Sequence, residues 1–140
     1  MEVKEAKDGD AICPGRVLIA PGGFHMTVER RGSGYIAKCK EGEKVSGHCP
    51  SVNQLFGSIA KLRGVNSLGV ILTGMGSDGA KGLLEMKQKG AETIGQNQAT
   101  CIVYGMPAVA YNIGAVDIQL PISAMPKRIY DWYNRKSEKK

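Results

Sequence analysis

The run of residues 70–80 constrains the fold of this chain more than any other stretch. It begins with the apolar stretch 70–72, passes through a glycine-rich turn and enters a helical pattern near Ala80. A strand that leads directly into such a turn and a helix is typical of parallel β-α-β units. The run therefore predicts an α/β architecture with a functional edge where the strand ends, because ligands and reactive side chains gather at the carboxyl ends of parallel strands.

The turn in this run supports two interpretations. Gly74, Gly76 and Gly79 match the Gly-x-Gly-x-x-Gly pattern that binds the phosphates of a dinucleotide. Against this, Asp78 would place a negative charge among the helix N-terminal N–H groups, and no acidic residue for the ribose follows the next expected strand, 91–95. Asp78 fits two other roles that are compatible with each other: a cap on its own helix and an acid that orients a histidine.

The composition is that of one globular domain. The 140 residues are 42% hydrophobic, which is enough for a core, and no stretch approaches the length of a membrane span. The first residues lack the apolar core of a signal peptide, so we expect a cytoplasmic protein without membrane insertion. The cysteines form no Cys-x-x-Cys pair, which predicts free thiols that mostly serve packing, and no metal site; they are Cys13, Cys39, Cys49 and Cys101.

The net charge of +6 is concentrated towards the C-terminus, in residues 127–140. No basic strip interleaved with aromatic residues, as on an RNA-binding sheet, accompanies this charge. We therefore expect no nucleic-acid partner, and we interpret the charged residues as a solvated helix end followed by a frayed tail.

The remaining pattern predicts a hairpin followed by alternating strands and helices. We expect residues 1–15 to be turn-like and the strand at 16–20 to be buried. Only three parallel strands follow the hairpin, which is consistent with a fold whose first part lies outside this chain. The expected strands are 16–20, 25–30, 35–40, 68–72, 91–95 and 116–120. The expected helices are 50–62, 78–89, 106–112 and 123–135.

Four long motifs, at 14–26, 47–56, 71–83 and 96–107, resemble the catalytic domain of bacterial chemotaxis protein-glutamate methylesterases of the CheB type. The resemblance implies a Rossmann-like, parallel three-layer α/β/α domain, here without its first β-α units and with an antiparallel hairpin near the N-terminus. It also implies hydrolysis of glutamate methyl esters, and deamidation of glutamines, on methyl-accepting chemotaxis receptors. Neither a metal nor an organic cofactor is implied.

The resemblance also assigns residues to the site. The family uses a Ser-His-Asp triad, and Asp78 matches the acid that holds the histidine in its tautomer. Met75 matches a position whose backbone N–H helps to bind the oxyanion. The family's serine, in a Gly-x-Ser-Thr-Gly-Gly turn, and its histidine both precede the point where this chain begins, as does its receiver domain.

Four residues outside the triad qualify the resemblance. His25 and His48 belong to other motifs of the family, so neither is expected to be the catalytic base. We expect His25 to be a hydrogen-bonding loop residue, or else to stand near the active-site end of the sheet. Cys49 and Asn53 occupy positions where the family has Arg and Asp, which affects substrate contacts or local ion pairing.

The prediction is thus a partial methylesterase catalytic domain at residues 1–126, followed by a helix end and basic tail at 127–140. Alone, the chain keeps only the acid of the triad and is expected to be inactive. Its partners would be the chemoreceptors, with a separate upstream segment and a receiver domain. One alternative is a non-catalytic relative that binds chemoreceptors or a partner chain, and a lesser alternative is a dinucleotide-binding domain.

Overall fold

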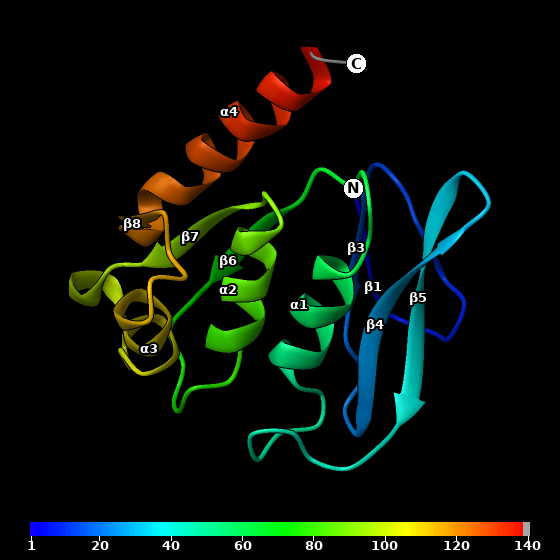
Figure 1. Cartoon of the computed structure of the whole chain (residues 1–140), viewed down its shortest axis with the longest axis horizontal. Helices are drawn as coiled ribbons and strands as arrows, with labels where there is room; N and C mark the ends of the chain where they lie inside the picture. The colour runs from blue at the N-terminus through cyan, green and yellow to red at the C-terminus, as the bar shows by residue number, and fades with distance from the viewer. Residues whose placement is uncertain (139–140) are drawn as a thin grey trace.

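The N-terminal part of the chain forms two small sheets, shown in blue and cyan in Figure 1. The computed structural model describes residues 1–138. β1 (Glu2–Glu5) pairs in parallel with β3 (Arg16–Ile19). β4 (Phe24–Arg31) and β5 (Gly34–Glu41) form the predicted hairpin, and β2 (Ala11–Ile12) pairs with the other edge of β5. We call the β2-β5-β4 sheet the hairpin sheet.

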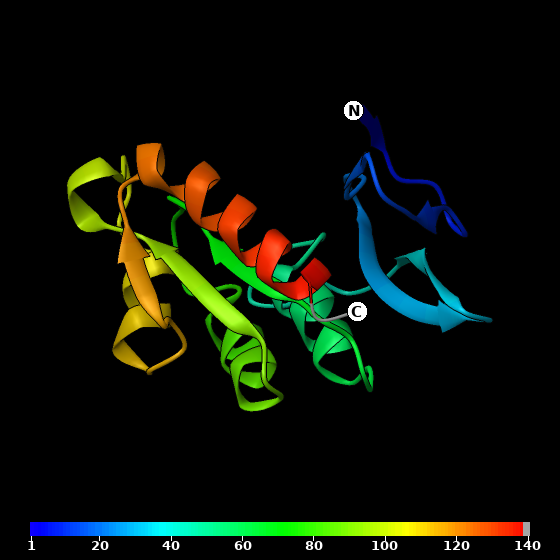
Figure 2. The ribbon, with the colours of Figure 1, turned by 90° about the horizontal axis from the view of Figure 1, so that it is seen from above.

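The rest of the chain is a three-layer α/β/α unit around the parallel sheet β6-β7-β8. Its strands are β6 (Leu68–Ile71), β7 (Glu92–Gln96) and β8 (Ile118–Leu120). Figure 2 shows α4 (Met125–Glu138) crossing one face of the sheet, whereas α1 (Val52–Ala60), α2 (Ala80–Gln88) and α3 (Met106–Asn112) lie on the other. Short 3₁₀ turns at Gln98–Thr100 and Ile122–Ala124 follow β7 and β8. The predicted fold class is confirmed.

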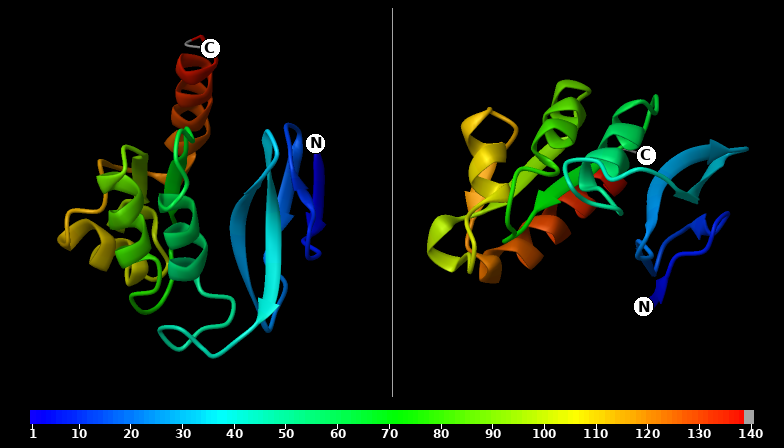
Figure 3. Two further views of the ribbon diagram at one scale, coloured as in Figure 1. Left: turned by 45° about the vertical axis from the view of Figure 1, so that its right-hand side comes forward. Right: turned by 90° about the horizontal axis from the view of Figure 1, so that it is seen from below.

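Helix α1 joins the two halves of the molecule. Figures 1 and 3 show it between α2 and the hairpin sheet. Leu55 packs against both hydrophobic clusters, the larger one around Leu83 and Met86 of α2 and the smaller one around Met26 and Ala37 of the hairpin sheet. The two clusters therefore meet at Leu55 of α1.

The close approach of α1 and α2 depends on a glycine. A Cβ added to Gly82 would lie 2.8 Å from the Phe56 Cβ and 3.1 Å from the Asn53 carbonyl oxygen. Gly57, on the facing side of α1, has more space, because its Cβ would lie 3.7 Å from a Glu85 carboxylate oxygen. The two helices are thus packed tightly at one glycine and loosely at the other.

The structure corrects the expectations at the start of the chain. Residues 1–15 contain the strands β1 and β2 instead of turns alone. β3 was expected to be buried, but Val17 and Ile19 are 40% and 53% exposed. The reason is that β3 pairs only with β1, and among residues 1–138 nothing covers the face that carries these two side chains and Val3.

The C-terminal helix extends further than the pattern indicates. α4 runs from Met125 to Glu138, so the predicted division between residues 126 and 127 falls inside a helix. Residues up to 138 in the expected frayed tail are helical, and residues 139–140 of that tail lie outside the described residues.

The four cysteines are free, and the predicted packing role fits three of them, because Cys39, Cys49 and Cys101 are partly buried. Cys13 is exposed, because it lies in the turn between β2 and β3. Cys39, on β5, is partly buried, and this burial together with the nearby Asp8 and Asp10 carboxylates raises the pKa of its thiol. The Cys39 backbone N–H in turn donates to Asp8 at 2.9 Å and lowers the pKa of that carboxyl group.

Alanine substitutions at the two helix glycines should change stability in opposite directions. Gly82→Ala should lower the free energy of unfolding by about 1–3 kcal/mol, because the new methyl group overlaps α1. Gly57→Ala, the matched control, should raise it by roughly 0.5–1 kcal/mol, because it removes backbone freedom without a clash. Urea unfolding of the three proteins measures both changes. A stabilising Gly82→Ala would contradict the described packing.

Alkylation should distinguish Cys13 from Cys39. The thiolate is the reactive form, so a raised thiol pKa and partial burial both slow Cys39. At mildly alkaline pH, iodoacetamide should modify Cys13 first, as followed by peptide mass spectrometry. Cys13→Ser should leave the slow rate at Cys39 unchanged, and equal rates at the two thiols would show that Cys39 is not shielded.

Candidate functional site

The turn that follows β6 is held in place by the segment before α3. The Gly74 N–H donates to the Val103 carbonyl at 3.0 Å, and the Gly74 carbonyl accepts from the Met106 N–H at 2.8 Å. Gly105 packs directly on this turn, where an added Cβ would lie 2.6 Å from the Gly74 carbonyl oxygen. The turn is therefore a rigid, braced loop, and its conformation is fixed by backbone contacts.

Asp78 lies at the end of this turn, and its carboxylate binds the N-terminus of α1. Only 3% of the residue is exposed. Its Oδ1 accepts from the Ser51 hydroxyl at 2.7 Å and from the Asn53 N–H at 3.1 Å, and its Oδ2 accepts from the Val52 N–H at 2.6 Å. A helix N-terminus favours a negative charge, and hydrogen bonds to a carboxylate are strong. The predicted cap exists, but on a different helix from the one expected.

The N-terminus of α2 is capped in return by a residue of α1. The Asn53 Oδ1 accepts from the Gly79 N–H at 3.1 Å and from the Gly82 N–H at 2.8 Å. Asn53 was expected to differ from the family by the loss of a carboxylate, and its amide oxygen supplies the acceptor that these donors need. The two helices thus exchange caps: Asp78, just before α2, caps α1, and Asn53, in α1, caps α2.

This exchange argues against a dinucleotide site. A pyrophosphate on the glycine-rich turn would need the free N–H groups at the start of α2. The expectation that Asp78 would fill this position is wrong, because its carboxylate faces α1. The Asn53 side chain binds two of those donors instead. The glycines are explained by the backbone conformation of the turn, since Gly76 and Gly79 have φ angles of 90° and 98°, which other residues rarely adopt.

Met75, the other predicted site residue, lies in the same turn but in a different environment. Its side chain is 76% exposed, whereas Asp78 is buried. Within residues 1–138, the Met75 N–H makes no hydrogen bond. The turn therefore presents a backbone donor at the surface and holds a carboxylate in the interior.

His25 is part of the site, although it lies in strand β4 and not in a loop. It is 9% exposed, and both ring nitrogens have partners. The Nε2 atom lies 2.6 Å from the Glu43 carbonyl oxygen, and Nδ1 accepts from the Ser51 N–H at 3.2 Å. His48 is exposed in the turn before α1. Ser51 is a residue of the candidate site that the sequence analysis missed, because it joins His25 to Asp78 while Pro50-Ser51 signalled only a helix start.

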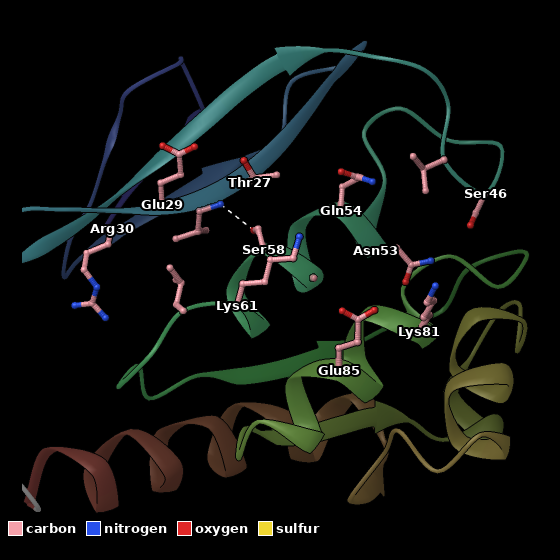
Figure 4. Close-up of a pocket in the computed structure, with 14 residues that line it drawn as sticks. Thr27, Glu29, Arg30, Ser46, Asn53, Gln54, Ser58, Lys61, Lys81 and Glu85 are labelled. Carbon is pink, nitrogen blue, oxygen red and sulfur yellow. Dashed lines mark hydrogen bonds between the residues drawn. The ribbon is translucent and has the colours of Figure 1, made fainter.

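A polar cleft of about 780 Å³ lies beside the capped helices, between β4, α1 and α2 (Figure 4). Asn53 and Gln54 lie near one end of it, and charged side chains of both signs line it: Glu29, Arg30, Lys61, Lys81 and Glu85. Asp78 does not line this cleft. Among residues 1–138, no group of three His, Cys, Asp or Glu side chains could hold a metal ion, and no helix is long and apolar enough to cross a membrane.

Removing the charge of Asp78 should destabilise the whole domain. Asp78→Asn keeps the shape but turns an NH₂ group towards N–H and O–H donors, so it should lower the free energy of unfolding by about 2 kcal/mol. Asp131→Asn is the control, because Asp131 forms an exposed pair with Lys127 on α4 and should change stability by less than about 0.5 kcal/mol. Equal changes in urea unfolding would mean that the Asp78 bonds contribute nothing.

Comparison with known proteins assigns the chain to a family. Residues 1–129 match the family described as CheB methylesterase. The chain is 50% identical over 135 residues to protein-glutamate methylesterase/protein-glutamine glutaminase 2 of Syntrophomonas wolfei, covering 96% of this chain and 40% of that protein. It is 58% identical over 129 residues to the corresponding protein of Sulfurimonas denitrificans, covering 92% and 37%.

A solved structure gives the same answer. The crystal structure of the Thermotoga maritima CheB methylesterase catalytic domain matches with a TM-score of 0.88 at 34% identity, covering 91% of this chain and 68% of that one. The chain spans about two-fifths of the length of the curated relatives it matches. The family model, the relatives and the solved structure agree, and the chain belongs to the CheB methylesterase family.

Proposed function

We propose that this chain forms part of a protein-glutamate methylesterase that also deamidates glutamine, acting on chemotaxis receptors. The family of the chain and the names of its relatives support this activity. The observation that carries the proposal is the buried Asp78 carboxylate, held in a fixed orientation just beyond the carboxyl end of β6. Such a carboxylate suits the acid of a Ser-His-Asp triad.

In this proposal Asp78 orients the base histidine. A carboxylate has about four acceptor positions, of which three are used here. Oδ2 accepts one bond, from Val52, so it keeps a lone pair for an imidazole N–H. The carboxylate would hold that imidazole in one tautomer and stabilise its cation while the serine attacks the ester carbonyl. The free Met75 N–H would be one donor to the resulting oxyanion.

The serine and the histidine would come from a polypeptide segment outside residues 1–140. No Gly-x-Ser-Thr-Gly-Gly turn occurs in the chain, and within residues 1–138 neither histidine bonds Asp78. Two features suit the addition of further β-α units: within residues 1–138, β6 pairs only with β7, and the β1-β3 sheet exposes Val3, Val17 and Ile19. An unpaired strand edge and an uncovered apolar face are both surfaces that a further layer would stabilise.

Reconstitution tests this function. The chain is mixed with a separately produced segment of a relative that carries the serine turn and the histidine, and methanol release from a methylated receptor fragment is measured. Turnover should need both parts and should fall by about a thousandfold or more with Asp78→Asn. Asp131→Asn serves again as the control and should keep full activity.

The outcome of this reconstitution also distinguishes the enzyme from the alternative, a non-catalytic relative. If the two parts associate and no turnover occurs with Asp78 intact, the enzyme proposal is wrong. Binding of the receptor fragment to the chain alone, measured by calorimetry, would then support a receptor-binding relative. The placement of both histidines favours keeping this alternative, since within residues 1–138 His25 is already bonded at both nitrogens and the exposed His48 is not among the hydrogen-bond partners of Asp78.

A further inference from the structure

A chain of hydrogen bonds connects the hairpin sheet to the Asp78 carboxylate. It runs from the Glu43 carbonyl to the His25 ring, from His25 to the Ser51 N–H, and from the Ser51 hydroxyl to Asp78, with distances of 2.6, 3.2 and 2.7 Å. The three side chains in it are 9%, 2% and 3% exposed. Buried polar side chains that satisfy one another in this way restrict each other's positions.

The partners of His25 fix its tautomer. The Ser51 N–H can only donate, so Nδ1 must carry a lone pair. The Glu43 carbonyl can only accept, so the proton is on Nε2. The loop after β5 closes over the ring, because a Cβ added to Gly42 would lie 3.0 Å from the His25 Cδ2. The imidazole is therefore hydrogen-bonded at both ring nitrogens, and a flip of the ring would break both bonds.

Ser51 is used in an unusual way for the residue before a helix. Its backbone is extended, with φ −108° and ψ 132°, as an N-cap requires, but its hydroxyl makes no bond to its own helix. The hydroxyl donates to Asp78, and the backbone N–H donates to His25. Ser51 is thus held from both sides and transmits the position of the imidazole to the carboxylate.

The hairpin sheet is fixed to α1 at a second point as well. The Val28 N–H of β4 donates to the Ser58 hydroxyl at 2.9 Å, two turns along the helix from Ser51. Two attachments on one strand set both the distance and the orientation of β4 relative to α1. The His25 ring accordingly approaches the N-terminus of α1 from a rigid support.

We propose that His25, acting through Ser51, is a positioning residue for the acid Asp78. The inference rests on the proposed function, because it concerns the carboxylate that the esterase would use. In it, His25 neither touches substrate nor transfers a proton. It holds the Ser51 N–H, which places the Ser51 hydroxyl on Oδ1 and leaves Oδ2 oriented towards the base histidine.

Two replacements of His25 separate this role from simple packing. His25→Asn keeps an acceptor near the position of Nδ1, whereas His25→Gln carries its polar group further out, near Nε2, and leaves the Ser51 N–H without an acceptor. Amide hydrogen exchange, followed by NMR, should accelerate roughly tenfold at Val52 and Asn53 in His25→Gln, relative to the core amide of Leu83. His25→Asn should accelerate it much less, and His48→Gln, the control, should leave it unchanged.

These measurements need no enzymatic activity, so they are independent of the proposed function. Imidazole nitrogen shifts should show the Nε2–H tautomer of His25, and an Nδ1–H tautomer would overturn the inference. So would equal exchange at Val52 and Asn53 in wild type and His25→Gln. If the His25 variants do not fold, Ser51→Ala decides: faster exchange at Asn53, restored by Ser51→Thr, supports the role, and unchanged exchange contradicts it.

The kinetics of the reconstituted esterase test the effect of His25 on catalysis. His25→Gln should lower kcat more than His25→Asn does and leave KM nearly unchanged, because the acid acts in the chemical step. If reconstitution gives no turnover even with wild type, the proposed function fails while the exchange result stands by itself. If turnover occurs and both His25 variants match wild type in kcat, His25 does not position the acid.

Discussion

The exchange of caps between α1 and α2 is the interaction on which the rest of this structure depends. Each helix begins in the interior, where unpaired N–H groups are costly. Asp78 accepts from two N–H groups at the start of α1, and Asn53 accepts from two at the start of α2. Because the two residues belong to neighbouring elements, the caps also set the relative position of the helices, and Gly82 permits that position.

The two capped helices are connected both to the parallel sheet and to the hairpin sheet. Towards the parallel sheet, the braced turn around Gly74 connects Asp78 to β6 and to the segment before α3. Towards the hairpin sheet, α1 holds β4 through Ser51 and Ser58 and packs Leu55 into both clusters. A site that lies at the junction of two subdomains is thereby supported by both of them.

The helices and strands whose pattern lies within a short stretch of sequence were predicted, and the elements that lack such a pattern were missed. The run 70–80 and the hairpin around Gly32 were predictable because strand patterns and turn residues lie together in the sequence. The contact of Asp78 with Ser51, 27 residues away, was not, because no local pattern reveals which helix start a buried carboxylate will meet. β1 was missed because its charged, mostly exposed residues lack apolar periodicity, and β2 was missed because a strand of two exposed residues is too short to show a pattern. Asp78 and Met75 were predicted as site residues from the resemblance alone, and the bond of Ser51 to Asp78 was not foreseen.

The exchanged caps have a consequence for substitutions at either capping position. A substitution at position 53 alters the helix that begins at residue 80, and one at position 78 alters the helix that begins at residue 52. A stability change measured at either position therefore reports on the start of the other helix. The two caps differ in chemistry, because the amide oxygen of Asn53 holds the start of α2 and the carboxylate of Asp78 holds the start of α1. Since only one of the two capping groups is a carboxylate, no like-charge repulsion between them opposes the close approach of the helices.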